Sequence, residues 1–411
     1  MKVNFEFCLN NSLVDPQSKN TQRQLAIEIS AIGDQQESQI PLNLCLVLEC
    51  SSSMTEGSLA KIKQAVISLI EQLDSNDRIS VVAFNHQATT IVPNQTLNNK
   101  AQIKQQINRL AAHGGTAIDE GLKLGIREVA VGKRDAVSHI LLLSHGENEQ
   151  GDNKRCIKLA QLASQYKITV NTLGLGANWN QDVLESIADV ASGTITYIEQ
   201  PEQAIAEFDK LLNRIKSVGL TDARLILELF SSARLARLKP IAQVSPETVE
   251  LNLIPEGNYY TVRLGDITRD LKRTILINLY IDRLTPGKHQ IAAMQLTYDA
   301  PATKEANLHS AIVSVEVEAT ETYQSQSNYQ VQKSVLTLAK YRQTKIAEAN
   351  LKQGDTESAA TMLNSAAKTA LQLGDRAGAI VLQQNAALLQ QGTALTEIAK
   401  KKIRLVSKIM Q

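Results

Sequence analysis

Three short polar segments of the sequence carry the residues that could do chemistry. They are residues 49–53 (Glu-Cys-Ser-Ser-Ser), residues 113–119 (His-Gly-Gly-Thr-Ala-Ile-Asp) and residues 144–148 (Ser-His-Gly-Glu-Asn). Hydroxyl and carboxylate oxygens are the ligands that a hard cation such as Mg²⁺ prefers. In an open parallel sheet the functional crevice lies beyond the carboxyl ends of the strands. We therefore expect the three segments to converge at that edge and to offer oxygen ligands.

The same side chains allow two other chemistries. Ser51, His145 and Glu49 could form a serine hydrolase triad, but the sequence has no Gly-x-Ser-x-Gly motif and nothing that supplies an oxyanion hole. Cys50 with His145 and Glu49 would select a softer ion such as zinc. Neighbouring residues at the end of a strand point in opposite directions, which argues against shared ligation by Glu49 and Cys50. We therefore favour a site for a hard cation with oxygen ligands over the serine hydrolase triad and the zinc site.

The pattern of residues 41–218 predicts the elements that would position these segments. Continuous apolar runs at 44–48, 79–84, 140–143 and 168–173 indicate strands that are covered on both faces. Segments with helical periodicity separate them, at 58–74, 100–110, 118–130, 152–166 and 181–190. Strands that alternate with helices are typical of a doubly wound α/β sheet.

The flanking regions have a different periodicity. Residues 1–40 and 219–320 alternate apolar and polar side chains, with turn signals at Pro255-Glu256-Gly257 and Pro286-Gly287, as expected of an antiparallel β-sandwich. Isolated strands are not stable alone. We therefore expect the amino-terminal strands to pair into the later sheet, which makes the α/β domain an insertion in the sandwich.

A helical tail is predicted for residues 328–411. Gly354-Asp355, Gly374-Asp375 and Gly392-Thr393 recur about every 20 residues. Glycine suits the end of one helix, and Asp or Thr suits the cap of the next. The pattern indicates αα-hairpins that resemble tetratricopeptide (TPR) units, either a partner-binding groove or a pack that stabilises the sandwich. The run from Lys400 to Arg404 is interpreted as a solvated helix face.

The three polar segments, in this order, resemble the metal-ion-dependent adhesion site (MIDAS) of von Willebrand factor A (VWA) domains. The family pattern is Asp-x-Ser-x-Ser, a threonine after paired glycines, and Asp-Gly-Glu-Asn. The resemblance covers residues 41–218 and implies that Ser51, Ser53 and Thr116 would hold Mg²⁺ directly. One position would stay open for a carboxylate of a partner. With its flanks, the whole chain is similar to a group of bacterial intracellular VWA proteins.

Both carboxylate positions of the pattern differ in this sequence. Glu49 is one methylene longer than the expected Asp, and His145 replaces the second Asp. One carboxylate remains near the ion instead of two, beside a histidine that can become cationic. We therefore expect a degenerate site that keeps the fold and binds Mg²⁺ weakly or not at all. The alternative is retained Mg²⁺ or Mn²⁺ with Glu49 reaching the ion through a water.

The amino-acid composition argues against some classes of binding partner. Lys plus Arg number 43 against 42 Asp plus Glu, so no net field attracts nucleic acid, and only 4% of residues are aromatic. No stretch approaches the ~18–20 apolar residues that cross a bilayer, no secretory signal is evident, and the four cysteines have no disulfide or metal spacing. We expect a cytoplasmic, non-catalytic scaffold that binds another protein through its VWA face or its tail.

Overall fold

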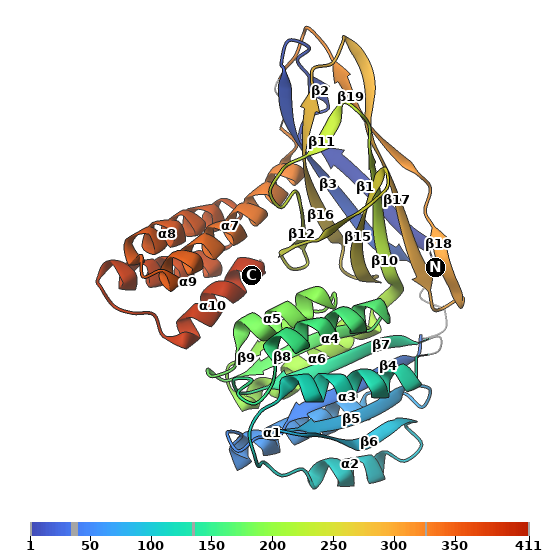
Figure 1. Ribbon diagram of the computed structural model, residues 1–411, viewed down its shortest axis with the longest axis vertical. Helices are drawn as coiled ribbons and strands as arrows, with labels where there is room; N and C mark the ends of the chain where they lie inside the picture. The colour runs from blue at the N-terminus through green and yellow to red at the C-terminus, as the bar shows by residue number, and fades with distance from the viewer. Residues whose placement is uncertain (1, 34–39, 134–135, 325–326, 410–411) are drawn as a thin grey trace.

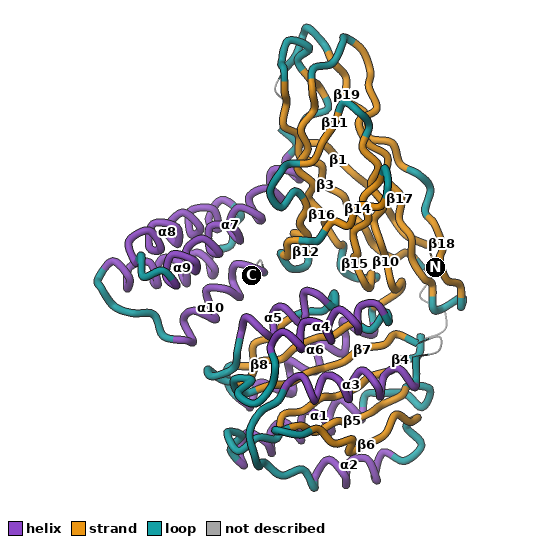
Figure 2. The backbone as a smooth tube through the Cα atoms, viewed as in Figure 1, coloured by secondary structure: helices purple, strands orange, loops and turns teal. Residues whose placement is uncertain are grey.

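The computed structural model describes residues 2–33, 40–133, 136–324 and 327–409, which form three bodies (Figure 1). An α/β unit, a β-sandwich and a helical tail lie next to one another. The chain begins in the sandwich, leaves it for the α/β unit, returns to complete the sandwich and ends in the tail. Figure 2 shows that strands dominate the sandwich, helices alone build the tail, and the α/β unit mixes both.

The α/β unit is a six-stranded sheet with helices on both faces. The strands are β4 (Leu42–Glu49), β5 (Arg78–Phe84), β6 (Ala88–Thr96), β7 (Val137–Ser144), β8 (Thr169–Leu175) and β9 (Ile195–Ile198). Their order is β6-β5-β4-β7-β8-β9, and all neighbours are parallel except β5 and β6. Every residue of β4 and of β7 is buried, as expected of central strands covered on both sides.

Two apolar cores enclose this sheet. The helices are α1 (Glu56–Glu71), α2 (Lys100–Asn108), α3 (Ile118–Val131), α4 (Asn153–Gln165), α5 (Gln181–Val190) and α6 (Ala204–Lys216), with a 3₁₀ turn η1 (Pro201–Gln203). Helices α1, α2 and α6 share one core with the sheet, and α3, α4 and α5 share the other. The expected doubly wound α/β fold is confirmed.

The sandwich takes strands from both ends of the α/β unit. They are β1 (Lys2–Leu9), β2 (Leu13–Val14), β3 (Asn20–Ile32), β10 (Val218–Leu229), β11 (Ala233–Leu235), β12 (Ile241–Ser245), β13 (Val249–Glu250), β14 (Leu253–Glu256), β15 (Tyr259–Thr268), β16 (Arg273–Asp282), β17 (Gly287–Ala300), β18 (Glu305–His309) and β19 (Val313–Ala319). One sheet runs β1-β3-β16-β12-β13 with β11 beside β16, and the other runs β14-β15-β10-β17-β19-β2 with β18 beside β17. Strand β3 pairs with β16, and β2 with β19, so the expected insertion is confirmed.

Four helices form the described part of the tail: α7 (Tyr329–Lys352), α8 (Thr356–Gln372), α9 (Arg376–Gln390) and α10 (Glu397–Lys408). Gly354 and Gly374 have φ of 83° and 81°, the left-handed conformation that favours glycine at a helix end. Asp355 and Asp375 cap α8 and α9. The third expected cap is wrong by three residues: Thr396, not Thr393, caps α10.

The surface run from Lys400 to Arg404 also needs correction. Lys400 stays exposed, whereas Lys401 is 4% exposed and Arg404 is 8% exposed, so only part of the run is a solvated helix face. Both side chains are buried where α10 meets the α/β unit. Their periodicity could not reveal this burial, because the surface that covers them comes from a distant part of the sequence.

The three bodies are joined by two kinds of contact. An apolar cluster links the sandwich to the tail, through Ala26 and Leu276 on one side and Val331, Leu338 and Tyr341 of α7 on the other. Among the described residues, no apolar cluster joins the α/β unit to the tail, and only Val218, the first residue of β10, extends a cluster of the α/β unit into the sandwich. The α/β unit meets its neighbours mainly through polar groups.

Several polar contacts join the α/β unit to the sandwich, among them two groups of buried or partly buried charges. His139 Nε2 lies 2.9 Å from Asp266 Oδ2, and Thr169 donates to the same carboxylate. Lys167 forms ion pairs with Asp222 and Asp299. Within the described ranges, no helix has the length and hydropathy to span a membrane.

Strand β3 provides a test of how far the amino-terminal segment belongs to the sandwich. Ile29 is fully buried in the sandwich core, whereas Ile32 on the same strand is 55% exposed. We expect Ile29→Ala to lower the free energy of unfolding by about 2–5 kcal/mol, because it removes buried methyl groups and leaves a cavity. The matched change Ile32→Ala should cost less than about 0.5 kcal/mol. Chemical denaturation measures both, and equal effects would contradict the placement of β3.

Candidate functional site

The three polar segments meet at the carboxyl ends of the central strands. Glu49 is the last residue of β4, and Ser144 is the last residue of the adjacent parallel strand β7. Thr116 lies just before α3. Backbone hydrogen bonds tie the loops together, from Ser52 N to Gly114 O (2.8 Å) and from His113 N to Cys50 O (2.9 Å). The sheet topology thus brings the expected residues to one place.

One oxygen of the Glu49 carboxylate binds the hydroxyl groups of the predicted metal ligands. Ser51 Oγ donates to Glu49 Oε1 at 2.5 Å, and Thr116 Oγ1 donates to the same oxygen at 3.1 Å. Ser53 Oγ lies 2.7 Å from Ser51 Oγ. Glu49 is fully buried and Ser51 and Thr116 almost so, while Ser53 is exposed at the mouth of the site.

The other carboxylate oxygen accepts from the third segment. Ser144 Oγ donates to Glu49 Oε2 at 2.7 Å, and the backbone N–H of His145 donates at 2.8 Å. The backbone N–H of Gly146 lies at 3.4 Å. A buried carboxylate is stable when its lone pairs accept hydrogen bonds. Glu49 therefore joins all three loops through its own side chain, and we call these residues the Glu49 cluster (Glu49, Ser51, Ser53, Thr116, Ser144, His145 and Gly146).

Gly146 lies beside the oxygens of the cluster. A Cβ atom at this position would lie 3.4 Å from Glu49 Oε1, 3.6 Å from Ser53 Oγ and 3.7 Å from Thr116 Oγ1. Three of the predicted ligand residues therefore point their oxygens at a common small space. The three loops converge as the resemblance to the MIDAS implies, although an oxygen of the Glu49 carboxylate lies directly among the hydroxyl groups.

The imidazole of His145 is directed to the next strand. A Cβ at Gly176, directly after β8, would lie 3.6 Å from His145 Nε2. His145 Nδ1 is buried and has no hydrogen-bond partner among the described residues. The backbone of His145, not its ring, contributes to the Glu49 cluster.

A softer metal finds no ligand set in this part of the molecule. Within the described residues, no group of three or more His, Cys, Asp or Glu side chains could hold a metal ion. Burial, with a contribution from the nearby Glu49, raises the pKa of Cys50 to about 11. The thiolate that zinc requires is therefore disfavoured.

The hydrolase triad is not assembled either. The hydroxyl of Ser51 donates to Glu49, and no hydrogen bond between Ser51 and the His145 ring occurs among the described residues. A base that activates a serine must lie within hydrogen-bond reach of its hydroxyl. The geometry also gives Glu49 the role of hydroxyl acceptor, not that of a group that orients an imidazole.

The donor set can be weighed against what Mg²⁺ requires. Mg²⁺ takes near-octahedral oxygen ligands at ~2.0–2.1 Å, usually with one or two carboxylates. The Glu49 cluster holds one carboxylate, and both of its oxygens already accept hydrogen bonds. These residues fit a hydrogen-bonded cluster better than a magnesium shell.

Sequence reasoning missed two contributors. Ser144 lies in the third polar segment and was not predicted as a site residue, although its hydroxyl donates to the Glu49 carboxylate. Asn148 accepts from Ile118 N at 2.7 Å and so caps α3, whose own N-cap residue Ala117 makes no side-chain bond. A polar residue directly after the apolar run 140–143 was the available signal for Ser144. Asn148 acts across 30 residues, which no local pattern reveals.

Comparisons with known proteins agree with this architecture. Residues 43–211 match the von Willebrand factor type A domain, and residues 329–411 match the Sll0103-like, C-terminal alpha-helical domain. The uncharacterized protein sll0103 of Synechocystis sp. is 51% identical over 408 residues, which cover 99% of this chain and 97% of that protein.

Two solved structures share the fold over nearly the whole chain. A von Willebrand factor type A protein from Catenulispora acidiphila has a TM-score of 0.83 at 18% identity, covering 99% of this chain and 97% of that one. The ArnB paralog VWA2 from Sulfolobus acidocaldarius has a TM-score of 0.61 at 14% identity, covering 99% and 98%. The chain therefore belongs to the family of Sll0103-like proteins, which join a von Willebrand factor type A domain to this C-terminal helical domain.

Proposed function

We propose that this protein is a non-catalytic binding protein whose VWA loop face engages another protein without a metal ion. The observation that supports this most directly is the position of the Glu49 carboxylate. It accepts hydrogen bonds from Ser51, Thr116 and Ser144, so the hydroxyl groups that would ligate Mg²⁺ are satisfied within the chain. The cluster thus holds the three loops together, as a bound ion would otherwise do.

The charge around the cluster indicates what such a partner would offer. Glu147 and Glu149 are exposed on the loop that follows β7, and Ser52 and His113 are exposed on the other two loops. With no cation to bridge them, a carboxylate from a partner would meet like charge. A surface that presents N–H donors or basic side chains suits this face better.

A reducing compartment fits this proposal, and each alternative would require contacts of the Glu49 cluster to change. The four cysteines are unpaired, with Cys45, Cys50 and Cys156 buried, which suits a reducing cytoplasm. Retained Mg²⁺ would require Glu49 to withdraw from its hydroxyl donors. A hydrolase would require Ser51 to exchange its contact with Glu49 for one with His145.

Replacement of Glu49 distinguishes a structural role of its carboxylate from a role in metal binding. Glu49→Ala should lower the free energy of unfolding by about 2–4 kcal/mol, because it leaves buried hydroxyl and N–H donors without an acceptor. The loss should be the same with and without millimolar Mg²⁺. Ser53→Ala, at the exposed mouth of the site, is the matched control and should cost less than about 0.5 kcal/mol. If Glu49→Ala lowered the free energy of unfolding only in the presence of Mg²⁺, the result would favour a metal site.

The two departures from the family pattern allow a gain-of-function experiment. In Glu49→Asp with His145→Asp, the shorter first side chain withdraws from the hydroxyl groups and a second carboxylate enters the pocket. Carboxylates of this kind affect metal affinity by ~10–100-fold each, so we expect at least about a tenfold gain for the pair, since neighbouring changes need not add.

The readout is the melting temperature with and without millimolar Mg²⁺, because a ligand that binds the native state alone raises it. The wild-type protein should not respond, and the double variant should. A folded double variant that still ignores Mg²⁺ would show that the loop backbone, not the two side chains, disfavours the ion.

Partner capture tests the proposed binding mode. Immobilised full-length protein should retain the same partners from a native lysate in EDTA as in millimolar Mg²⁺. Ser52→Arg, which places a bulky cation on the loop face, should remove them, whereas Gln391→Arg on the exposed turn before α10 should not. Loss of capture in EDTA would overturn metal-free binding, and indifference to Ser52→Arg would exclude the loop face.

A further inference from the structure

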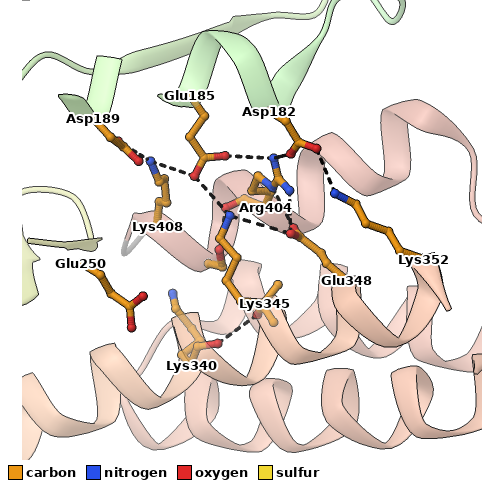
Figure 3. Close-up of polar contacts among 12 residues, drawn as sticks. Asp182, Glu185, Asp189, Glu250, Lys340, Lys345, Glu348, Lys352, Arg404 and Lys408 are labelled. Atoms are coloured by element: carbon orange, nitrogen blue, oxygen red, sulfur yellow. Dashed lines mark hydrogen bonds and ion pairs between the residues drawn. The ribbon is translucent and has the colours of Figure 1, made fainter. Parts of the chain in front are cut away.

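Two helices that are about 220 residues apart in the sequence carry matching stripes of charge. On α5 of the VWA domain, Asp182, Glu185 and Asp189 are spaced i, i+3 and i+7, which places them on one face. On α10 of the tail, Lys401, Arg404 and Lys408 have the same spacing. Figure 3 shows the α5 carboxylates directed at side chains of the tail. We call these residues the acidic stripe and the basic stripe.

Arg404 and Lys408 of the basic stripe together contact all three carboxylates of the acidic stripe. Arg404 Nη1 lies 2.7 Å from Asp182 Oδ1 and 3.0 Å from Glu185 Oε2. Lys408 Nζ lies 3.0 Å from Glu185 Oε1 and 2.9 Å from Asp189 Oδ1.

At the start of α5, Lys401 donates to Ala177 O and lies over the Trp179 ring, 4.8 Å from its centroid. All three basic residues are less than 9% exposed. The basic stripe is therefore fully used in this contact.

Helix α7 supports the contact from the side. Lys345 and Lys352 reach Glu185 and Asp182 at 3.3 and 2.9 Å. Glu348 accepts two hydrogen bonds from Arg404, at 2.9 and 2.7 Å, and so fixes the guanidinium within the tail (Figure 3). The tail thus presents a preformed cationic surface to α5.

This interface differs in kind from the one between the tail and the sandwich. The apolar face of α10, with Ile403 and Val406, belongs to the core of the tail itself. Cavities of about 480 and 370 Å³ flank the contact with α5. Polar interfaces that lack an apolar core permit relative motion of domains. The VWA domain can therefore separate from α10 while the tail stays packed on the sandwich.

The neighbouring basic side chains compensate the charges of the three carboxylates to different degrees. Desolvation acts against ionisation of Asp182, but Lys352 and Arg404 outweigh it and lower the pKa to about 2. At the other end, desolvation outweighs the attraction of Lys408 and raises the pKa of Asp189 to about 6. Ion pairs that are taken out of water gain little net stability, because the desolvation cost offsets their attraction. The contact is selective for charge pattern and inexpensive to open.

We propose that the acidic stripe of α5 is an interaction surface for a helix with basic residues at i and i+4, and that α10 occupies it in cis until such a helix from a partner protein replaces it. Charge complementarity identifies the occupant, since Arg404 and Lys408 show which spacing the three carboxylates accept. The exposed Asp182, whose side chain is 60% accessible, gives an incoming helix its first contact. This surface is separate from the Glu49 cluster and does not depend on the state of that site.

A peptide with the sequence of α10 can test the surface in the full-length protein. The probe is Glu397–Lys408, held helical by a staple between positions 399 and 403 on its apolar face and labelled with a fluorophore. Titrated at low ionic strength, it should bind Arg404→Gln/Lys408→Gln at least about tenfold more tightly than wild type, because the cis competitor is weakened. Binding should fall at least about tenfold in Asp182→Asn/Glu185→Gln/Asp189→Asn, which keeps the shape of α5 and removes its charge.

A second measurement uses the wild-type α10 and so does not depend on variants that could disturb the tail. Donor and acceptor dyes at the exposed positions Glu149 and Thr393 report the distance between the VWA loops and the tail. Saturating peptide should lower energy transfer, and a peptide of the same composition with scrambled order should not. Equal binding to the α5 triple variant, or unchanged energy transfer when the peptide is bound, would overturn the proposal. The Glu49→Asp/His145→Asp protein should behave as wild type here, which separates this result from the fate of the loop-face proposal.

Discussion

The ladder between β3 and β16 is the interaction on which the rest of the structure depends. It joins residues before the VWA domain to residues after it, from Asn20 opposite Asp282 to Ile29 opposite Arg273. One face of β3 adds Leu25, Ile27 and Ile29 to the sandwich core, and the other adds Ala26 to the cluster that holds α7. A single strand therefore closes the insertion and anchors the tail, whereas the VWA domain contacts the other two bodies mainly through polar groups.

The sequence predicted what depends on short-range patterns. The helix expected over 181–190 is α5, and the one expected from residue 58 starts two residues earlier because Thr55 caps it. Strand β6 was not predicted: it lies at the sheet edge, is mostly polar and contains Pro93, so it lacks the pattern of a buried strand. Periodicity reports burial, and an edge strand buries little.

The site shows a different limit. The residue types at Glu49 and His145 were sufficient to predict a departure from the family pattern, and the loops do converge as expected. The expected site binds Mg²⁺ weakly or not at all, and only the alternative of a retained ion has the longer side chain reach the metal through a water. In the structure this side chain bends onto the hydroxyls of Ser51, Thr116 and Ser144. The position of this carboxylate among the hydroxyl groups depends on how the three loops pack, which a sequence pattern does not report.

The Glu49 cluster and the acidic stripe show two solutions to the same physical problem, the burial of carboxylates. Glu49 is satisfied by neutral donors from its own domain, which are short, preorganised and costly to leave unpaired. The stripe is satisfied by long cationic side chains from another body, which can be exchanged for similar groups at little net cost. The first arrangement holds loops in place, and the second suits a contact that opens. Because α5 begins beside Trp179 and Asn180, and Asn180 donates to Glu147 of the loop face at 2.6 Å, the two arrangements are also physically continuous. The loop face and the acidic stripe therefore lie on adjoining parts of the same domain.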